Sequence, residues 1–213
     1  MEIKNTFMLV VSLKVPERYI SGLVDVTRDI VKDKSGTRSL EKNPDHAHIS
    51  LYVGIFPVSN KEKVINTVRD ISSGFKPIEI NPKGLGNKSG YVSISFYAKD
   101  DLMLFHKTLM NRLNPLREGL VKDIYTNSDV LKRLDPKEIE NMKKWGYPYG
   151  FKNFNPHITL FKFEDERYAE EVASSFIDLS FLSDFKSEAV EMIFTEDKEY
   201  EERSREKIII PFR

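Results

Sequence analysis

The sequence has no cysteine, no excess of charge of either sign and no long apolar run, and each absence excludes a class of protein. Without cysteine the chain can form no disulfide, no thiolate zinc site and no thiol nucleophile. Lysine plus arginine and aspartate plus glutamate both number 33, whereas proteins that bind extended duplex nucleic acid usually carry a basic excess. No stretch approaches the roughly 18 apolar residues that cross a bilayer. We therefore expect a cytoplasmic protein with neither a membrane nor an extended duplex as partner. We also expect a monomer.

The rest of the composition is ordinary for a globular domain. Hydrophobic residues make up 40% of the chain and charged residues 31%, and 14 phenylalanines and nine tyrosines supply material for a core. A chain of 213 residues usually forms one domain, so we expect residues 1–213 to fold together. A balanced net charge still permits a nucleotide or a short RNA as partner, because such a ligand needs only a local basic pocket.

Apolar periodicity predicts an α+β domain made of two related halves. Strands are expected at residues 6–15, 46–56, 76–80, 91–97, 155–163, 185–195 and 207–212. Helices are expected at residues 17–32, 61–71, 100–113, 136–145 and 166–176. Proline and three glycines predict a loop over residues 82–90. Residues 114–152 are the least regular part, and we expect them to form a lid or insertion.

A short motif occurs twice, about half a chain apart. Residues 48–52 read His-Ile-Ser-Leu-Tyr, and residues 157–161 read His-Ile-Thr-Leu-Phe. Both copies are rich in strand-forming residues, and a strand sends alternate side chains to opposite faces. The histidine, the hydroxyl residue and the aromatic residue of each copy are therefore expected on one face. Two such strands suggest one site with two halves.

The motif residues suit the cleavage of a phosphodiester. Histidine titrates near neutral pH, so His48 and His157 could remove a proton from the attacking oxygen and give one to the leaving oxygen. The hydroxyls of Ser50 and Thr159 could bind the phosphate oxygens. This chemistry needs no metal ion and no cofactor. A single histidine in a strand is usually structural, but the repetition of the whole motif favours catalysis here.

The two motifs resemble those of the 2H phosphoesterase superfamily. That superfamily includes 2′-5′ RNA ligase-like proteins and cyclic phosphodiesterases that act on 2′,3′-cyclic phosphates. The resemblance implies a bilobal, pseudo-twofold α+β fold, with two antiparallel sheets around a central cleft and helices outside. It also implies a hydrolase in which His48 and His157 are catalytic and Ser50 and Thr159 bind phosphate. Ser50 stands where threonine is more common.

Four aromatic residues are candidates for stacking on a base. Tyr52 and Phe161 end the two motifs, and the alternative for both is a place in the core below the site. Tyr147 and Tyr149 lie in the predicted loop before the second motif, where aromatic residues often contact ligands. The stretch from residue 146 to 149 also resembles a bacterial subgroup linked to phosphonate metabolism.

The two remaining histidines lie outside the repeated positions. His46 could contact a phosphate, or it could be a strand-end residue near solvent. His106 falls inside the predicted helix at residues 100–113, where a structural or exposed role is the simpler interpretation.

Three functions remain open on the sequence. The first is a metal-independent phosphoesterase that opens a 2′,3′-cyclic phosphate or cleaves a 2′-5′ linkage in a nucleotide or short RNA. The second is a non-enzymatic module that binds nucleotides or RNA ends. The third is a phosphoesterase for a non-nucleotide phospho-compound.

Overall fold

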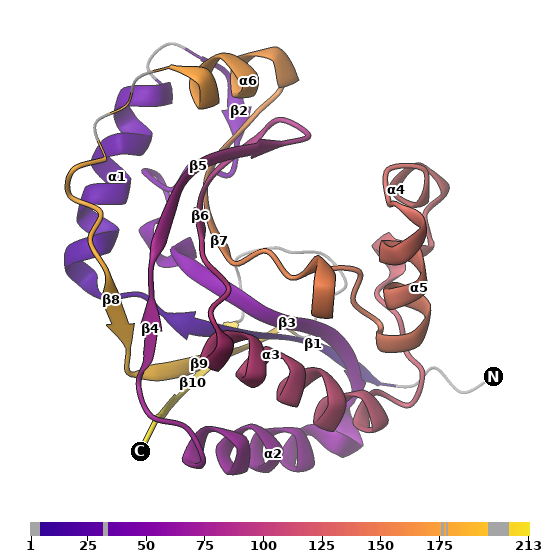
Figure 1. Cartoon of the computed structure of the whole chain (residues 1–213). Helices are drawn as coiled ribbons and strands as arrows, with labels where there is room; N and C mark the ends of the chain where they lie inside the picture. The colour runs from indigo at the N-terminus through magenta and orange to yellow at the C-terminus, as the bar shows by residue number, and fades with distance from the viewer. Residues whose placement is uncertain (1–4, 32–33, 176, 178, 196–204) are drawn as a thin grey trace.

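The computed structural model describes residues 5–31, 34–175, 177, 179–195 and 205–213, and its strands form two four-stranded antiparallel sheets and one small sheet (Figure 1). The first sheet has the order β10-β9-β1-β3, with bounds Arg205–Pro211, Ala189–Thr195, Thr6–Lys14 and His48–Pro57. The second sheet has the order β2-β7-β6-β5, with bounds Gly36–Thr37, His157–Phe163, Tyr91–Phe96 and Pro82–Lys88. The small sheet pairs β4, Ile78–Ile80, with β8, Phe185–Ser187. Each motif strand thus belongs to a different large sheet.

Helices cover the outer faces of both large sheets. Helices α2, Lys61–Ser73, and α3, Asp100–Leu113, pack against each other and against the first sheet. Helices α1, Glu17–Val31, and α6, Glu166–Ser174, pack against the second sheet. Among the described residues, no helix combines the length and the apolar character needed to cross a membrane. The predicted α+β architecture of two sheets with helices outside is therefore confirmed.

The apolar residues that predict β1 and α1 form the hydrophobic core. In β1, the side chains of Leu9, Val11 and Leu13 are fully buried. Full burial of an aliphatic side chain stabilises a fold by about 1.5–3 kcal/mol, so this strand is a major source of stability. In α1, Leu23 faces the same interior and is also fully buried.

The prediction of a loop at residues 82–90 was wrong, because residues 82–88 form β5 at the edge of the second sheet. A strand that begins with proline is tolerated at an edge, where one side needs no ladder hydrogen bonds. Gly86 packs closely, since a Cβ at this position would lie 3.0 Å from the Ser95 hydroxyl oxygen on β6. Glycine here keeps the neighbouring face of β6 open.

The single strand predicted over residues 185–195 is two strands in different sheets. β8 pairs with β4, and β9 pairs with β1 on the other side of Glu188. The Ser187 hydroxyl donates to the carbonyl of Lys14 at 2.9 Å, which fixes the point where the chain passes from one sheet to the other. Apolar residues continue through the change of sheet, so periodicity alone does not reveal it.

Residues 114–152 form a separate helical segment, called the insertion below. It contains α4, Ser128–Leu131, and α5, Pro136–Trp145. Helix α5 starts with a capping box between Asp135 and Glu138 and ends at Gly146, whose φ of 71° lies in the left-handed region. In Figure 1 the ribbons of α4 and α5 lie to one side of the second sheet, and an ion pair at 3.0 Å between Glu138 of α5 and Lys88 of β5 links the two.

A buried arginine holds the insertion together. The Arg117 side chain is 3% exposed and donates to the Asn114 side chain at 2.8 Å and to the Lys144 carbonyl at 2.9 Å. It also donates to the carbonyl of Leu120. These bonds tie the beginning of the insertion to the last turn of α5.

Candidate active site

Both motif strands contain a β-bulge at the same motif position. In β3, residues 50 and 52 pair with neighbouring residues of β1, so Leu51 between them is the extra residue. In β7, residues 159 and 161 pair with neighbouring residues of β6, so Leu160 is the extra residue. A bulge shifts the alternation of faces by one residue. The repeat in sequence is therefore also a repeat in backbone geometry.

The bulges give the two strands the same order of exposure. Over residues 48–54 and 157–163 the side chains run accessible, buried, accessible, buried, buried, accessible, buried. The accessible positions are His48, Ser50 and Val53 in β3, and His157, Thr159 and Lys162 in β7. Each histidine thus shares an accessible face with its hydroxyl residue, as the alternation predicts.

The motif aromatics lie on the other face, which corrects the expectation that they share the face of the histidines. Tyr52 is 0% exposed and Phe161 is 2% exposed, because each follows a bulge that turns it into the core. Burial raises the pKa of the Tyr52 hydroxyl, and the nearby Arg117 charge acts in the opposite direction. Neither ring has the free face that stacking on a base requires, so both take the alternative role in the core.

The carbonyl of each bulge residue is bound from outside its sheet ladder. The ring of His106, on α3, donates from Nδ1 to the carbonyl of Leu51 at 2.7 Å. The backbone amide of Leu40 donates to the carbonyl of Leu160 at 2.8 Å. Both bulges are thereby fixed by a specific hydrogen bond, which stabilises the twist that separates the two faces.

His106 connects the two motifs through the core. Because its Nδ1 donates to a carbonyl, its Nε2 is the acceptor, and the Phe151 amide donates to it at 2.9 Å. The ring also stacks on Phe154 at a centroid distance of 4.0 Å and an interplanar angle of 8°. Burial lowers the pKa of His106 to about 4, so the ring is neutral at pH 7. The expected structural role for this histidine agrees with these contacts, although its place beside the motif strand was not visible in the sequence.

His157 is oriented by the residue two positions before it. Its Nδ1 lies 2.8 Å from the carbonyl of Asn155, and a carbonyl can only accept, so Nδ1 carries the hydrogen. In the neutral ring, Nε2 is therefore the nitrogen with the lone pair. Asn155 follows Phe154, so the stack on His106 fixes the backbone that orients His157.

Strand β6 adds two hydroxyl residues that the motifs do not contain. Ser95 pairs with His157, and Ser93 pairs with Thr159. Both serines are partly exposed, while Val92 and Ile94 beside them are fully buried. The alternation in residues 91–97 predicts that these serines share one face of a strand. It does not predict that the neighbouring strand is the one that carries the second motif.

The two tyrosines before the second motif have different surroundings. Tyr147 is 6% exposed and packs between Tyr52 and Tyr149, with ring centroids 6.1 Å and 5.7 Å away. The expected stacking role does not fit so buried a ring. Tyr149 is half-buried, and Lys88 at the end of β5 lies 5.2 Å from its ring centroid. Burial raises the pKa of Tyr149, with the Lys88 charge opposing it.

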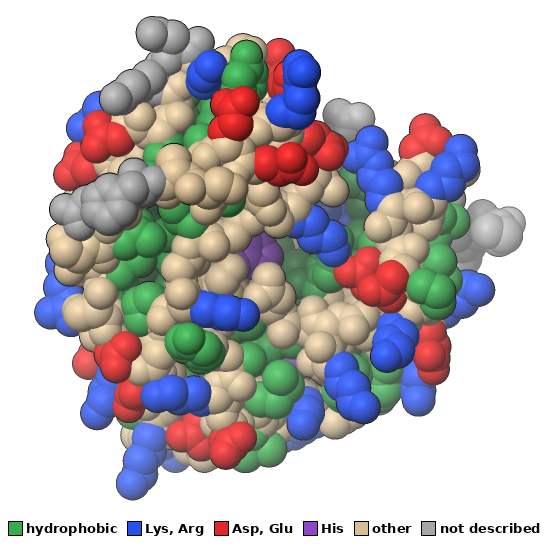
Figure 2. All heavy atoms as spheres, turned by 45° about the horizontal axis from the view of Figure 1, so that its top comes forward, with side chains coloured by type: hydrophobic (Ala, Val, Ile, Leu, Met, Phe, Trp, Pro, Cys, Tyr) green, Lys and Arg blue, Asp and Glu red, His purple; other side chains and the backbone are tan. Residues whose placement is uncertain are grey.

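The motif strands are neighbours although they belong to different sheets, since β3 and β7 are in contact. Figure 2 shows a hollow in the molecular surface with a histidine at its floor and lysine or arginine side chains at its edge. His46, which ends a short 3₁₀ turn before β3, is half-buried. The arrangement joins imidazoles and hydroxyls from two strands at the contact between the sheets.

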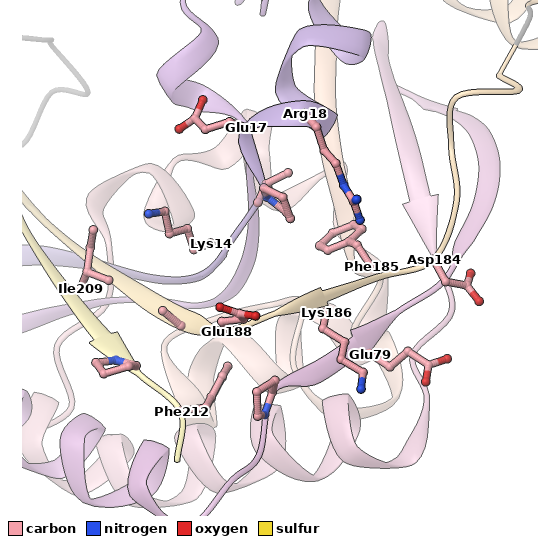
Figure 3. A pocket seen from close by; sticks show the side chains of 15 residues that line it. Lys14, Glu17, Arg18, Glu79, Asp184, Phe185, Lys186, Glu188, Ile209 and Phe212 are labelled. Carbon is pink, nitrogen blue, oxygen red and sulfur yellow. The ribbon is translucent and has the colours of Figure 1, made fainter.

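A separate pocket lies beside the C-terminal end of β1, where Lys14, Val15 and Pro16 line it, and none of the motif residues belongs to its lining. It has a volume of about 1080 Å³ and is lined from β1, β8 and the ends of β9 and β10. Figure 3 shows acidic and basic side chains interspersed around it, among them Arg18, Asp184 and Glu188. The described residues that line it include carboxylates, lysines and an arginine but no histidine, serine or threonine, so the lining has neither an imidazole nor a hydroxyl nucleophile. The motif face is the better candidate for an active site.

The chain has the fold of the 2H phosphoesterases. The crystal structure of TT0787 from Thermus thermophilus matches with a TM-score of 0.62 and 13% identity, covering 95% of this chain and 94% of that one. Crystal structures of Escherichia coli LigT, complexed with 3′-AMP and with ATP, match with TM-scores of 0.51 and 0.52. Both are 11% identical and cover 98% of this chain and 96% of LigT. At such identities the likeness concerns the fold.

A sequence-family model also matches the chain. The model described as "Protein of unknown function (DUF1045)" matches residues 55–191, and the chain belongs to this family. The matched range contains the insertion and the second motif, and it begins just after the first motif. No curated protein sequence matches the chain.

Proposed function

We propose that the protein is a metal-independent phosphodiesterase in which His48 and His157 act as the general acid and base. The substrate is a 2′,3′-cyclic phosphate or a 2′-5′ phosphodiester in a nucleotide or short RNA. Ser50 and Thr159 bind the non-bridging phosphate oxygens. The proposal rests on one observation above all: two contacting strands repeat the same histidine, hydroxyl and bulge.

The bulges support a catalytic use of the motifs. If the histidines served only the core, no reason would exist for both strands to turn them outward and to turn the following aromatics inward. The second histidine is also prepared for proton transfer, because the Asn155 carbonyl holds its Nδ1 hydrogen and leaves Nε2 to exchange a proton.

The reaction proceeds by in-line attack at phosphorus. One neutral imidazole removes a proton from water while the water oxygen forms a bond to phosphorus. The bond from phosphorus to the 2′ or 3′ oxygen breaks, and the protonated imidazole gives its proton to that oxygen. The product is a phosphomonoester, and exchange of protons with solvent restores both rings. Hydroxyls from Ser50 and Thr159 stabilise the charge on the phosphoryl oxygens.

Binding of nucleotides by a protein of the same fold supports the substrate class. LigT has been crystallised with 3′-AMP and with ATP. For this chain, the accessible hydroxyls and the lysine and arginine side chains at the edge of the hollow suit a phosphate ligand.

The test is hydrolysis of a panel of 2′,3′-cyclic nucleotides and 2′-5′-linked oligoadenylates in the presence of EDTA. We expect turnover by the wild type, and a loss of kcat of at least about 100-fold in His48→Ala and in His157→Ala. The control is Lys63→Ala, which changes an exposed residue of α2 and should leave kcat unchanged. Full activity in either motif variant would refute the assignment. Tight binding without turnover across the panel would instead favour a binding module.

A further inference from the structure

Basic side chains gather at the end of the motif face that lies away from His157. Along the ladder between β6 and β7, Ser95 faces His157, Ser93 faces Thr159, and Tyr91 faces Lys162. Lys162 is partly exposed because the bulge returns the strand to the accessible face at that position. Four ladder steps separate it from His157, about 13 Å along the strand.

Two of these cations lie close to the Tyr91 ring. The Lys162 ammonium lies 5.1 Å from the ring centroid, and the Arg38 guanidinium carbon lies 5.9 Å from it. Both distances are within the range of cation–π contacts. Arg38 comes from the chain just after β2, where Thr37 pairs with Lys162. Three separate segments therefore converge on one place.

The position of Arg38 is fixed by its backbone. Its φ is 54°, a left-handed conformation that costs a residue with a side chain about 1–2 kcal/mol. The Leu40 amide, two residues later, holds this segment to the Leu160 bulge carbonyl at 2.8 Å. The strained turn and the second motif are thus one unit, and the turn directs an arginine to the motif face.

The insertion brings a third cation to the same place. Lys122 is half-buried, and its pKa is lowered first by that burial and then by the charge of Arg38. The charge of Arg38 thus acts on Lys122, and the geometric contacts of the cluster are those of Arg38 and Lys162 with the Tyr91 ring. Cations gathered on an accessible face of a strand attract a phosphate group.

We propose that Arg38, Lys122 and Lys162, grouped around Tyr91, form a basic subsite for a second phosphate group of the substrate. The inference rests on the proposed function, because it takes the first phosphate to lie between the two motif histidines. An arginine can bind a phosphate through two parallel hydrogen bonds, and the lysines add point charges from both sides. The substrate class is accordingly a compound with two phosphoryl groups, and a phosphodiester without a second anion is a poorer substrate.

The test measures affinity, which needs no turnover. The probes are adenosine 3′,5′-bisphosphate and adenosine 3′-monophosphate, titrated calorimetrically into the wild type at low and at moderate salt. A second pair spans a longer distance: 2′-5′-linked diadenosine with and without a 5′-phosphate, titrated into His157→Asn so that it is not cleaved. In at least one pair we expect the extra phosphate to tighten binding tenfold or more, and added salt to reduce that ratio.

Neutral variants locate the effect. Lys162→Gln and Lys122→Gln should each lower the ratio of affinities at least threefold, whereas Lys63→Gln, an exposed lysine on α2, should leave it unchanged. The proposal would be overturned if, with Lys122 and Lys162 in place, the extra phosphate left the affinity unchanged in both pairs of ligands. It would also be overturned if neither variant lowered the ratio.

The outcome is separable from that of the proposed function. If the affinity ratio behaves as expected but no cyclic phosphate or 2′-5′ linkage is cleaved, the subsite stands and the assigned reaction fails. If the panel is cleaved but the extra phosphate adds no affinity, the reaction stands and the subsite fails.

Discussion

At the scale of single residues, His106 links the two motif segments. Its ring bonds the carbonyl of Leu51 in the first bulge and the amide of Phe151 ahead of the second motif. Both partners are backbone groups of segments that present catalytic candidates. Phe151 itself has a φ of 54°, so its amide is held in a left-handed turn that this hydrogen bond helps to fix. A single buried ring therefore sets the relative position of two segments far apart in sequence.

Replacing His106 by phenylalanine keeps a ring of similar shape but removes both hydrogen bonds. Two buried backbone groups then lose their partner, at a cost of about 1–3 kcal/mol each. We expect His106→Phe to lower the free energy of unfolding by about 2–4 kcal/mol at pH 7, measured by urea denaturation. Lys107→Ala, an exposed neighbour on the same helix, is the control and should change it by less than about 0.5 kcal/mol.

The same variant should change how stability depends on pH. The folded-state pKa of His106 is about 4, below the ordinary value of 6.5, so the unfolded chain binds this proton more readily than the folded chain. Stability from the neutral ring is therefore present above about pH 6.5 and is lost as the pH falls toward 4. At pH 4.5 the destabilisation of His106→Phe relative to the wild type should shrink by about 2–3 kcal/mol. A difference that stays constant between pH 7 and pH 4.5 would show that His106 does not titrate as described.

At the scale of elements, Arg117 decides whether the insertion is a defined structure. Its three acceptors come from the start of the insertion and from the last turn of α5. A lysine cannot reach all three, because it carries one ammonium in place of a planar guanidinium. We expect Arg117→Lys to lower the free energy of unfolding by about 1–3 kcal/mol and to increase proteolytic cleavage within residues 118–146 several-fold.

The control for that experiment is Arg133→Lys, since Arg133 is an exposed arginine of the same insertion. It should leave both readouts unchanged. Equal cleavage of the wild type and Arg117→Lys would mean that the insertion is held by contacts other than this arginine.

The elements also show where sequence patterns are informative. Helix α5 was predictable at both ends, because Asp135, Pro136 and Gly146 are local signals for a cap, a first turn and a stop. Strand β5 was not, because Gly86 lies against the Ser95 hydroxyl of β6 and Gly84 has a φ of 131° at an irregularity in the pairing with β6, and neither glycine belongs to a local turn. The division between β8 and β9 depends on which distant strand pairs with each half, and no local pattern contains that information.

The site divides in the same way. The histidines and hydroxyls of the motifs were visible because both copies carry them at the same spacing. The inward turn of Tyr52 and Phe161 was not, because a bulge is defined only when the partner strand is known. Ser93, Ser95 and Lys162 joined the candidate site only once β6 and β7 were seen to pair.

At the scale of the whole molecule, we propose that the insertion closes over the motif face when a phosphate ligand binds. The subsite would draw Lys122 toward Arg38, and an ion pair at 3.0 Å already links Glu138 of α5 to Lys88 of β5. Because the chain has no cysteine, dyes can be attached at Lys132→Cys on the insertion and at Lys83→Cys on β5. Energy transfer between them should rise when adenosine 3′,5′-bisphosphate is added.

The control places both dyes outside the insertion, at Lys63→Cys and Lys83→Cys, where the ligand should cause no change. Transfer that is equal with and without the ligand in the first pair would argue for a fixed wall beside the site. Such a result would leave the acid–base assignment intact, because neither motif histidine belongs to the insertion.

The extra residue in each motif strand changes how relatives of this protein should be compared. In an unbroken strand, the fourth residue after each histidine would reach the ligand. Here it is the fifth, Val53 after one histidine and Lys162 after the other. Variation in substrate among family members should therefore be sought in those two alignment columns. Members of the family that lack lysine in the second column should bind substrates without a second phosphate group.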